Sequence, residues 1–136
     1  MAGNRVARGA RRVKGGLILA LLLVLALPGC AEAQALRCVA TDGDSLRCGR
    51  ERIRIAGLDA PEIQGRCARE RRLAVAARDR LQGLVAGGVT IRSLGEDRYG
   101  RTLARVRDRG GRDVARVLIA EGLARPYEGG RRRGWC

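Results

Sequence analysis

The sequence contains no histidine and no phenylalanine, and its aromatic residues are Tyr99, Tyr127 and Trp135. The absence of histidine excludes mechanisms that need an imidazole, such as Ser-His-Asp hydrolysis and Cys-His proteolysis, and it excludes Cys/His zinc sites. An all-cysteine zinc site is a remaining alternative, but the chain has no C-x-x-C spacing to support it. The three aromatic rings offer little surface for stacking the bases of a nucleic acid.

Long hydrophobic runs are also absent. The run from Leu17 to Leu27 is eleven residues long, which is too short to cross a bilayer as a helix. Basic residues without an acid precede it and small residues follow it, so residues 1–33 are predicted to be a signal peptide that is cleaved before Gln34. We therefore expect an exported domain, periplasmic or secreted, over residues 34–136.

Three alternatives to this cleavage remain open. Cleavage before Leu36 also fits the small residues of the leader. A lipoprotein signal would end before Cys30, whose acylation would anchor the domain to a membrane. An uncleaved membrane anchor is the third alternative.

Lysine is nearly absent, since Lys14 is the single one, and the net charge of +14 is therefore carried almost entirely by arginine. Residues 1–33 hold five of the 28 cations and one of the 14 acids, so residues 34–136 keep 23 cations against 13 acids, a net charge of +10. Arginine forms bidentate contacts with phosphate, and a polyanion is the expected partner. Coding bias toward arginine is an alternative source of part of this excess.

Four cysteines follow the predicted leader, and an even number in a small exported domain predicts two disulfides. Residues 36–41 and 45–48 are predicted to form a hairpin around the turn 42–44. A three-residue loop would place Cys38 opposite Cys48, whereas a two-residue loop would pair Cys38 with Arg47. The cysteine at both positions favours the three-residue loop and a Cys38–Cys48 bridge, with Cys67–Cys136 as the second bridge, although four cysteines allow three connectivities.

The apolar pattern then predicts a third strand, 51–58, in which Ile53 and Ile55 face the core and Arg54 faces the other way. Helices are predicted over 67–85 and 113–121, and strands over 89–94 and 102–107. The apolar face of the first helix is expected to consist of Leu73, Ala77, Leu81, Leu84 and Val85. Five short strands with two helices fit an α+β domain built on a small five-stranded barrel of the oligonucleotide-binding type (OB-fold).

Polar residues suited to phosphodiester chemistry lie at the strand ends. Asp44 follows the first turn, and Asp59 and Glu62 flank Pro61 at the end of the third strand. Carboxylate oxygens on loops favour Ca²⁺. Glu62 is a candidate base for activating water, although any one of these acids taken alone is more often an ordinary turn or cap residue.

Arg54 and Arg101 are candidate phosphate clamps, because a phosphodiester gains negative charge as it is attacked. An isolated arginine on so basic a protein is more often simply solvated. The two arginines support a phosphate-binding role only in combination with the acids.

Four motifs occur in order along the chain: Asp42-Gly43-Asp44-Ser45-Leu46, the segment from Arg54 to Glu62, Asp97-Arg98-Tyr99-Gly100-Arg101 and Glu121-Gly122-Leu123-Ala124. Together they resemble the motifs of the staphylococcal nuclease (thermonuclease) family. The resemblance implies an OB-fold enzyme that hydrolyses DNA and RNA with Ca²⁺ and cuts the P–O5′ bond to leave 3′-phosphates.

The resemblance also implies roles for individual residues. Asp44 and Asp59 match carboxylate ligands of calcium, and Ala60 matches a ligand that acts through its backbone carbonyl. Glu62 matches the catalytic glutamate, and Arg54 and Arg101 match the catalytic arginines. The implied nucleotide-binding residues are Arg98, Tyr99 and Tyr127. The chain departs from the family pattern at its end, where a Gly/Arg-rich tail closed by Cys136 replaces a long C-terminal helix.

The main alternative is a non-catalytic nucleic-acid-binding module of the same fold. Such modules hold strands by stacking bases on aromatic side chains, and this chain has few of them. A cationic exported protein that acts on anionic surfaces is a third hypothesis, which accounts for the charge but not for the motifs. The sequence therefore favours a monomeric enzyme with nucleic acids as substrates.

Overall fold

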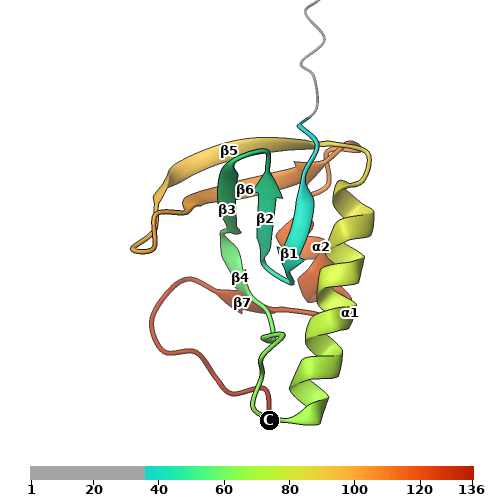
Figure 1. The fold of residues 1–136 in the computed structure, drawn as a ribbon, viewed down its shortest axis with the longest axis vertical. Coiled ribbons are helices and arrows are strands. Elements are labelled where there is room, and N and C mark those ends of the chain that lie inside the picture. The colour runs from blue at the N-terminus through green and yellow to red at the C-terminus, as the bar shows by residue number, and fades with distance from the viewer. Residues whose placement is uncertain (1–35) are drawn as a thin grey trace, which may run out of the picture. The chain divides into compact units, whose positions relative to one another are not determined.

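The computed structural model describes residues 36–136 (Figure 1). The predicted signal peptide and Cys30 lie outside this part. Within it, no helix has the length and apolar character needed to span a membrane. The elements in chain order are β1 Val39–Asp42, β2 Ser45–Cys48, β3 Glu51–Ile55, β4 Gly57–Asp59, α1 Ala68–Val85, β5 Val89–Glu96, β6 Thr102–Asp108, α2 Val114–Ala120 and β7 Arg125–Tyr127.

Five strands form one sheet in the order β1-β2-β3-β6-β5, in which β3 and β6 are parallel and the other neighbours antiparallel. The two edges of the sheet meet in a single bridge, where the N–H of Val89 donates to the carbonyl of Leu36 (3.1 Å). With its two helices this is the predicted α+β domain of the oligonucleotide-binding type.

The first hairpin differs from the prediction at its turn. Asp42 pairs with Ser45, so the turn has two residues and not three, and a register shift between Ala40 and Asp42 compensates. Such a bulge adds one residue to one strand, and it therefore restores the pairing of Val39 with Arg47 farther from the turn. The Cys38–Cys48 disulfide forms as predicted, by way of the bulge.

The prediction of one continuous strand over 51–58 is wrong. The chain turns at Ala56 and Gly57, where the left-handed φ of 84° at Gly57 favours glycine. The residues beyond the turn form β4, which pairs with β7, a strand that the sequence did not predict. This break separates Arg54 and Asp59 onto two short strands that belong to different sheets.

The core lies between the sheet and the helices and is built from aliphatic side chains, with Leu46, Ile53, Ile55, Leu81 and Leu118 at most 1% exposed. Helix α1 packs along β1 (Figure 1).

The predicted apolar face of α1 is confirmed at Ala77, Leu81, Leu84 and Val85, which are buried. Leu73 is only half-buried, and Glu70 and Ala74 are buried in addition. Glu70 is buried because its carboxylate accepts hydrogen bonds from backbone N–H groups of the loop that precedes the helix.

A second disulfide joins Cys67, at the start of α1, to Cys136, as predicted. Residues 128–136, which we call the C-terminal tail, leave β7 and return to the beginning of α1 (Figure 1). This return brings the tail to the loop that carries Glu62.

Candidate active site

Asp44 and Arg54 form a buried ion pair at the hairpin turn. Their side chains are 9% and 6% exposed, and Arg54 Nη2 lies 3.1 Å from Asp44 Oδ2. The guanidinium also donates to the carbonyls of Ile55 (2.6 Å) and Leu58 (2.9 Å), on either side of the break between β3 and β4. Burial lowers the pKa of Arg54, while the charge of Asp44 opposes this shift.

Asp59 ends β4 and is 5% exposed, with Ala60 buried beside it. Its Oδ1 is buried and accepts no hydrogen bond among the described residues, although Arg132 Nε lies 3.2 Å away. The two observations agree if the guanidinium faces this oxygen at an angle too poor for a hydrogen bond. A buried carboxylate oxygen with unused acceptor capacity, beside another buried carboxylate, fits a hard cation such as Ca²⁺.

Glu62 lies on the loop that follows Pro61, and its side chain is 53% exposed. Buried Glu70 holds this loop by accepting from the N–H of Glu62 (3.4 Å) and of Arg66 (2.9 Å). Gly65 leaves room for this contact, because a Cβ there would lie 2.4 Å from the Glu70 side chain.

The pKa of Glu62 is raised. Partial burial is the largest cause, and the charges of Asp42, Asp44 and Asp59 add to it while Arg132 opposes it. A raised pKa makes the carboxylate a better proton acceptor. The acids of the turn and of β4 are therefore near enough to the loop for their charges to act on Glu62.

Arg101 is fixed by Asp97, which accepts from its backbone N–H (3.0 Å) and from Nε (2.7 Å). Its Nη1 donates to Ser45 Oγ (3.4 Å), which in turn donates to Asp44 Oδ1 (2.8 Å). A chain of contacts therefore runs from Arg101 through Ser45 and Asp44 to Arg54. The structure thus brings both predicted arginines to the same acid, Asp44.

A groove of about 720 Å³ runs beside this cluster. Arg54, Arg98, Tyr99, Arg101 and Tyr127 all line it, so the predicted nucleotide-binding residues share a groove with the predicted clamps. Tyr99 is 60% exposed, with the guanidinium of Arg98 4.9 Å from its ring centre. The Tyr127 hydroxyl donates to the carbonyl of Gly130 (2.9 Å).

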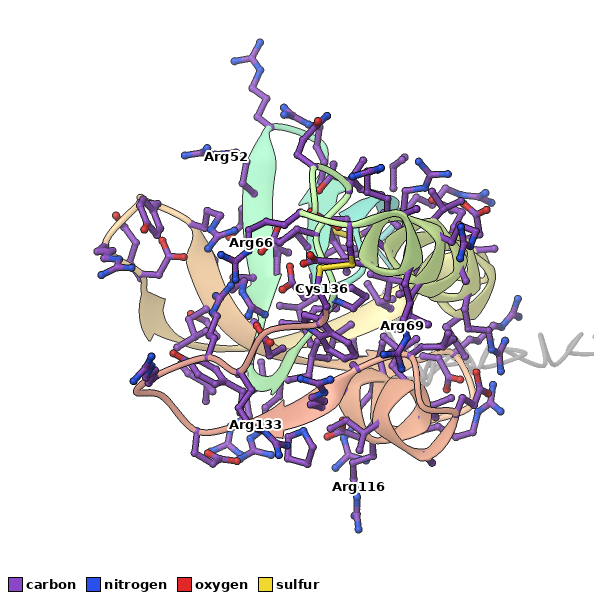
Figure 2. All side chains as sticks on the ribbon, turned by 90° about the horizontal axis from the view of Figure 1, so that it is seen from below. Arg52, Arg66, Arg69, Arg116, Arg133 and Cys136 are labelled. Carbon is purple, nitrogen blue, oxygen red and sulfur yellow. A yellow bond between two sulfur atoms is a disulfide. The ribbon has the colours of Figure 1, made fainter. Side chains whose placement is uncertain are left out.

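Arginine side chains project on many sides of the domain, with Arg52 and Arg116 on opposite sides in Figure 2. The groove is therefore distinguished by its tyrosines and by arginines that are paired with acids, and not by positive charge alone. The basic surface is suited to a polyanion at long range, whereas the groove supplies specific contacts.

Sequence reasoning missed several residues that shape the site. Arg132 of the C-terminal tail lies against Asp59 and donates to Glu62 (Nη1 to Oε1, 3.3 Å). Buried Glu70 was assigned no role, and Asp97 was noted only as part of a motif. No local pattern marks Arg132, because its contact depends on the fold and on a disulfide between residues 69 positions apart.

One cluster of three potential metal-ligating side chains occurs among residues 36–136, namely Cys67, Glu70 and Cys136. Both cysteines are bonded to each other, so they are not free thiolate ligands. The candidate calcium ligands are two side chains, Asp44 and Asp59, and the backbone carbonyl of Ala60, so they do not form a cluster of three side chains. Their hard oxygen donors suit calcium better than sulfur does.

Comparison with known proteins agrees with this geometry. The family model described as staphylococcal nuclease homologue matches residues 52–133, more than half of the chain. The chain belongs to this family. The match spans Arg54, Asp59, Glu62 and Arg101 and also reaches Arg132 in the tail.

One curated relative of this staphylococcal nuclease homologue is the succinoglycan biosynthesis protein ExoI of Rhizobium meliloti (strain 1021). It is 32% identical over 115 residues, which cover 80% of this chain and 60% of the relative. The chain thus spans well under two thirds of the relative's length. Membership in the family supports a nuclease-type function directed at nucleic acids.

Proposed function

We propose that this protein is an exported, calcium-dependent nuclease that hydrolyses phosphodiester bonds of DNA and RNA. The observation that carries the proposal is that the two arginines line one groove, while Asp59 and Glu62 line the hollow with which it shares Arg132. Asp44 connects the two sets, because it pairs with Arg54 and its charge acts on Glu62. In this proposal Asp44, Asp59 and the carbonyl of Ala60 hold Ca²⁺. When bound, the ion would polarise a phosphoryl oxygen and lower the cost of placing a phosphate beside the acids.

The chain's own residues would divide the chemistry among them. Glu62 accepts a proton from the water that attacks phosphorus, and the P–O5′ bond breaks. The departing 5′-oxygen takes a proton from solvent water, so the products are a 3′-phosphate and a 5′-hydroxyl. Arg54 and Arg101 stabilise the charge that develops on the phosphoryl oxygens. Both arginines are held by fixed partners, so little reorganisation is needed as the charge forms.

Tyr99, Tyr127 and Arg98 would bind the neighbouring nucleotides along the groove. Tyr99 is exposed and available for contact with a base, while Arg98 supplies a mobile positive charge for a backbone phosphate.

Export is part of the same proposal. Two disulfides in a domain of this size suit an oxidising compartment, and residues 1–33 have the pattern of a cleavable signal. Lipid attachment through Cys30 is the alternative route to the outside of the cytoplasmic membrane.

Digestion of plasmid DNA, single-stranded DNA and RNA by residues 34–136 tests the proposal, with Ca²⁺ and with excess chelator. We expect cleavage only with Ca²⁺, and we expect Glu62→Gln to lower kcat by about 10²–10⁴-fold with little loss of binding. Cleavage that persists in chelator would remove the metal from the mechanism. An undiminished rate in Glu62→Gln would remove Glu62.

A further inference from the structure

The C-terminal tail covers both oxygens of the Asp59 carboxylate. Oδ1 faces Arg132 Nε at 3.2 Å, and Oδ2 accepts from the indole Nε1 of Trp135 (3.3 Å). The Arg132 guanidinium reaches farther and also donates to Glu62 (3.3 Å). One cation of the protein itself therefore lies against the two acids to which the proposed function gives the tasks of ligand and base.

The charges explain why the guanidinium is drawn to this place. Asp59 is almost fully buried, so its negative charge is costly without a partner. Asp44 already has its partner in Arg54, whereas Asp59 and Glu62 share Arg132.

We propose that Arg132 is the resident counter-ion of Asp59 and Glu62, that a cation bound by Asp59 displaces it, and that Arg132 thereby sets the calcium affinity of the site. This inference rests on the proposed function. A guanidinium and a divalent cation that share one carboxylate repel each other, so the protein's own charge weakens the binding of the ion.

Arg132 lies in the tail between two glycines and the disulfide-bonded end. Gly129 and Gly130 adopt left-handed φ values of 106° and 86° at the start of the tail, and Cys136 fixes its end to Cys67. Trp135 gives the tail a further contact with the domain, because the Arg125 guanidinium stacks 3.7 Å from the centre of its ring.

Arg132 also lies at a boundary between two hollows. It lines the hollow that contains Asp59 and Glu62, and it lines the groove that contains Arg54 and Arg101. On the side of the groove, the centre of the Tyr127 ring lies 5.4 Å from Arg132 Cζ. A guanidinium displaced from Asp59 could therefore move into the groove, next to this ring.

Calcium titration by calorimetry, on the protein with both disulfides formed and without nucleic acid, tests the inference directly. We expect Arg132→Gln to bind Ca²⁺ about three- to tenfold more tightly than the wild type, because a unit charge close to the ion is removed. Arg131→Gln is the matched control: it removes the same charge from the neighbouring, exposed residue of the tail. We expect it to stay within about twofold of the wild type, since Asp59 and Glu62 pair with Arg132 and not with Arg131, and an exposed charge farther from the ion is screened.

Thermal unfolding provides a second readout that is independent of activity. In excess chelator, Arg132→Gln is expected to unfold at a lower temperature than Arg131→Gln, because two acids lose their counter-ion. In saturating Ca²⁺ the difference should disappear. Equal melting temperatures of the two variants in chelator would overturn the proposal.

The outcomes separate this inference from the proposed function. If the wild type binds Ca²⁺ and cleaves DNA but Arg132→Gln binds the ion no more tightly than Arg131→Gln, only the role of Arg132 is wrong. If neither the wild type nor the variants bind Ca²⁺, the calcium-dependent function fails and this inference fails with it.

Discussion

At the scale of single residues, the site depends on side chains whose own positions are fixed by other side chains. Asp97 fixes Arg101 through its backbone N–H and its Nε, and Ser45 links Arg101 to Asp44. Glu70 does the same for the loop that carries Glu62. Arg101 and the loop of Glu62 are thus each held by a supporting acid.

The chain contains a duplicate of the Asp97–Arg101 contact away from the groove. Asp108 accepts from the backbone N–H (2.9 Å) and the Nε (2.7 Å) of Arg112, four residues on. We expect Asp97→Asn and Asp108→Asn each to lower the free energy of unfolding by about 1–3 kcal/mol, because each removes charged hydrogen bonds. Only Asp97→Asn should also lower kcat, since only Arg101 borders the proposed site.

Denaturant unfolding and steady-state kinetics of the two variants measure these effects side by side. An equal loss of kcat in both would mean that Asp97 supports the fold alone.

The same two aspartates predict a loss of stability in acid. Burial raises the pKa of both aspartates, but hydrogen bonds outweigh this effect and lower both pKa values. The donors to Asp97 are Arg101 and Tyr99, and the donors to Asp108 are Arg112 and Gly110. A lowered folded-state pKa stabilises the fold above the unfolded value of about 3.9. This stabilisation is lost as the pH falls through the pKa values of the folded protein. The Asp108→Asn variant lacks the part that Asp108 contributes, because asparagine does not titrate.

Melting temperatures between pH 7 and pH 2 test this dependence. The gap between the wild type and Asp108→Asn should be constant at neutral pH and narrow below about pH 4. A gap that widens in acid would contradict the assignment.

At the scale of elements, the hairpin turn between β1 and β2 fits tightly against two other segments. A Cβ on Gly43 would lie 2.9 Å from the Cβ atoms of both Ala60 and Ala77. Gly43→Ala is therefore expected to cost about 1–3 kcal/mol of stability. It should also weaken Ca²⁺ binding, because it pushes apart the turn that holds Asp44 and the loop that holds Ala60.

Gly83 in α1 offers the matched control, since a Cβ there meets nothing within 4 Å. We expect Gly83→Ala to stabilise the protein by about 0.5–1 kcal/mol through helix propensity, without a change in Ca²⁺ affinity. Calorimetric titration and denaturant unfolding of both variants measure this contrast. A Gly43→Ala variant as stable as Gly83→Ala would show that the turn is not tightly packed.

The sequence predicts the elements well where the pattern is local. Periodicity indicates α1, α2 and the sheet strands to within a few residues, and paired cysteines predict both disulfides. The prediction fails where pairing between segments far apart in the sequence determines the local structure. The pattern of residues 51–58 predicts one strand, yet the turn at Gly57 and the pairing of β4 with β7 divide it. The bulge in β1 likewise follows from pairing and is not visible in the pattern.

The site was predictable to a similar extent. Motifs indicated the two arginines and the acids, because these residues sit within short, ordered segments. Arg132 was not predictable, because it reaches Asp59 only through β7 and the disulfide-bonded tail. Its role is a property of the folded chain.

At the scale of the whole molecule, the net charge of +10 on residues 34–136, from 23 cations and 13 acids, predicts attraction to nucleic acids that weakens with salt. If about four arginines contact phosphates of a single strand, the affinity should fall roughly 30- to 100-fold between 50 and 200 mM salt. Fluorescence anisotropy with single-stranded DNA in chelator measures binding without cleavage.

Single variants locate the contacts behind this salt dependence. Arg98→Gln removes a charge from the groove and should reduce the slope of log K against log salt by about 0.7, whereas Arg116→Gln on α2 should leave it unchanged. Equal slopes for both variants would place the strand outside the groove.

The central claim is that one cation and one phosphate meet between the acids and the arginines. A crystal structure of Glu62→Gln with Ca²⁺ and a short single-stranded DNA tests it most directly. We expect Ca²⁺ at about 2.3–2.6 Å from oxygens of Asp44, Asp59 and the Ala60 carbonyl, with one phosphate in contact with Arg54 and Arg101. Calcium bound elsewhere, or DNA seated on another face with no phosphate at these arginines, would contradict the account.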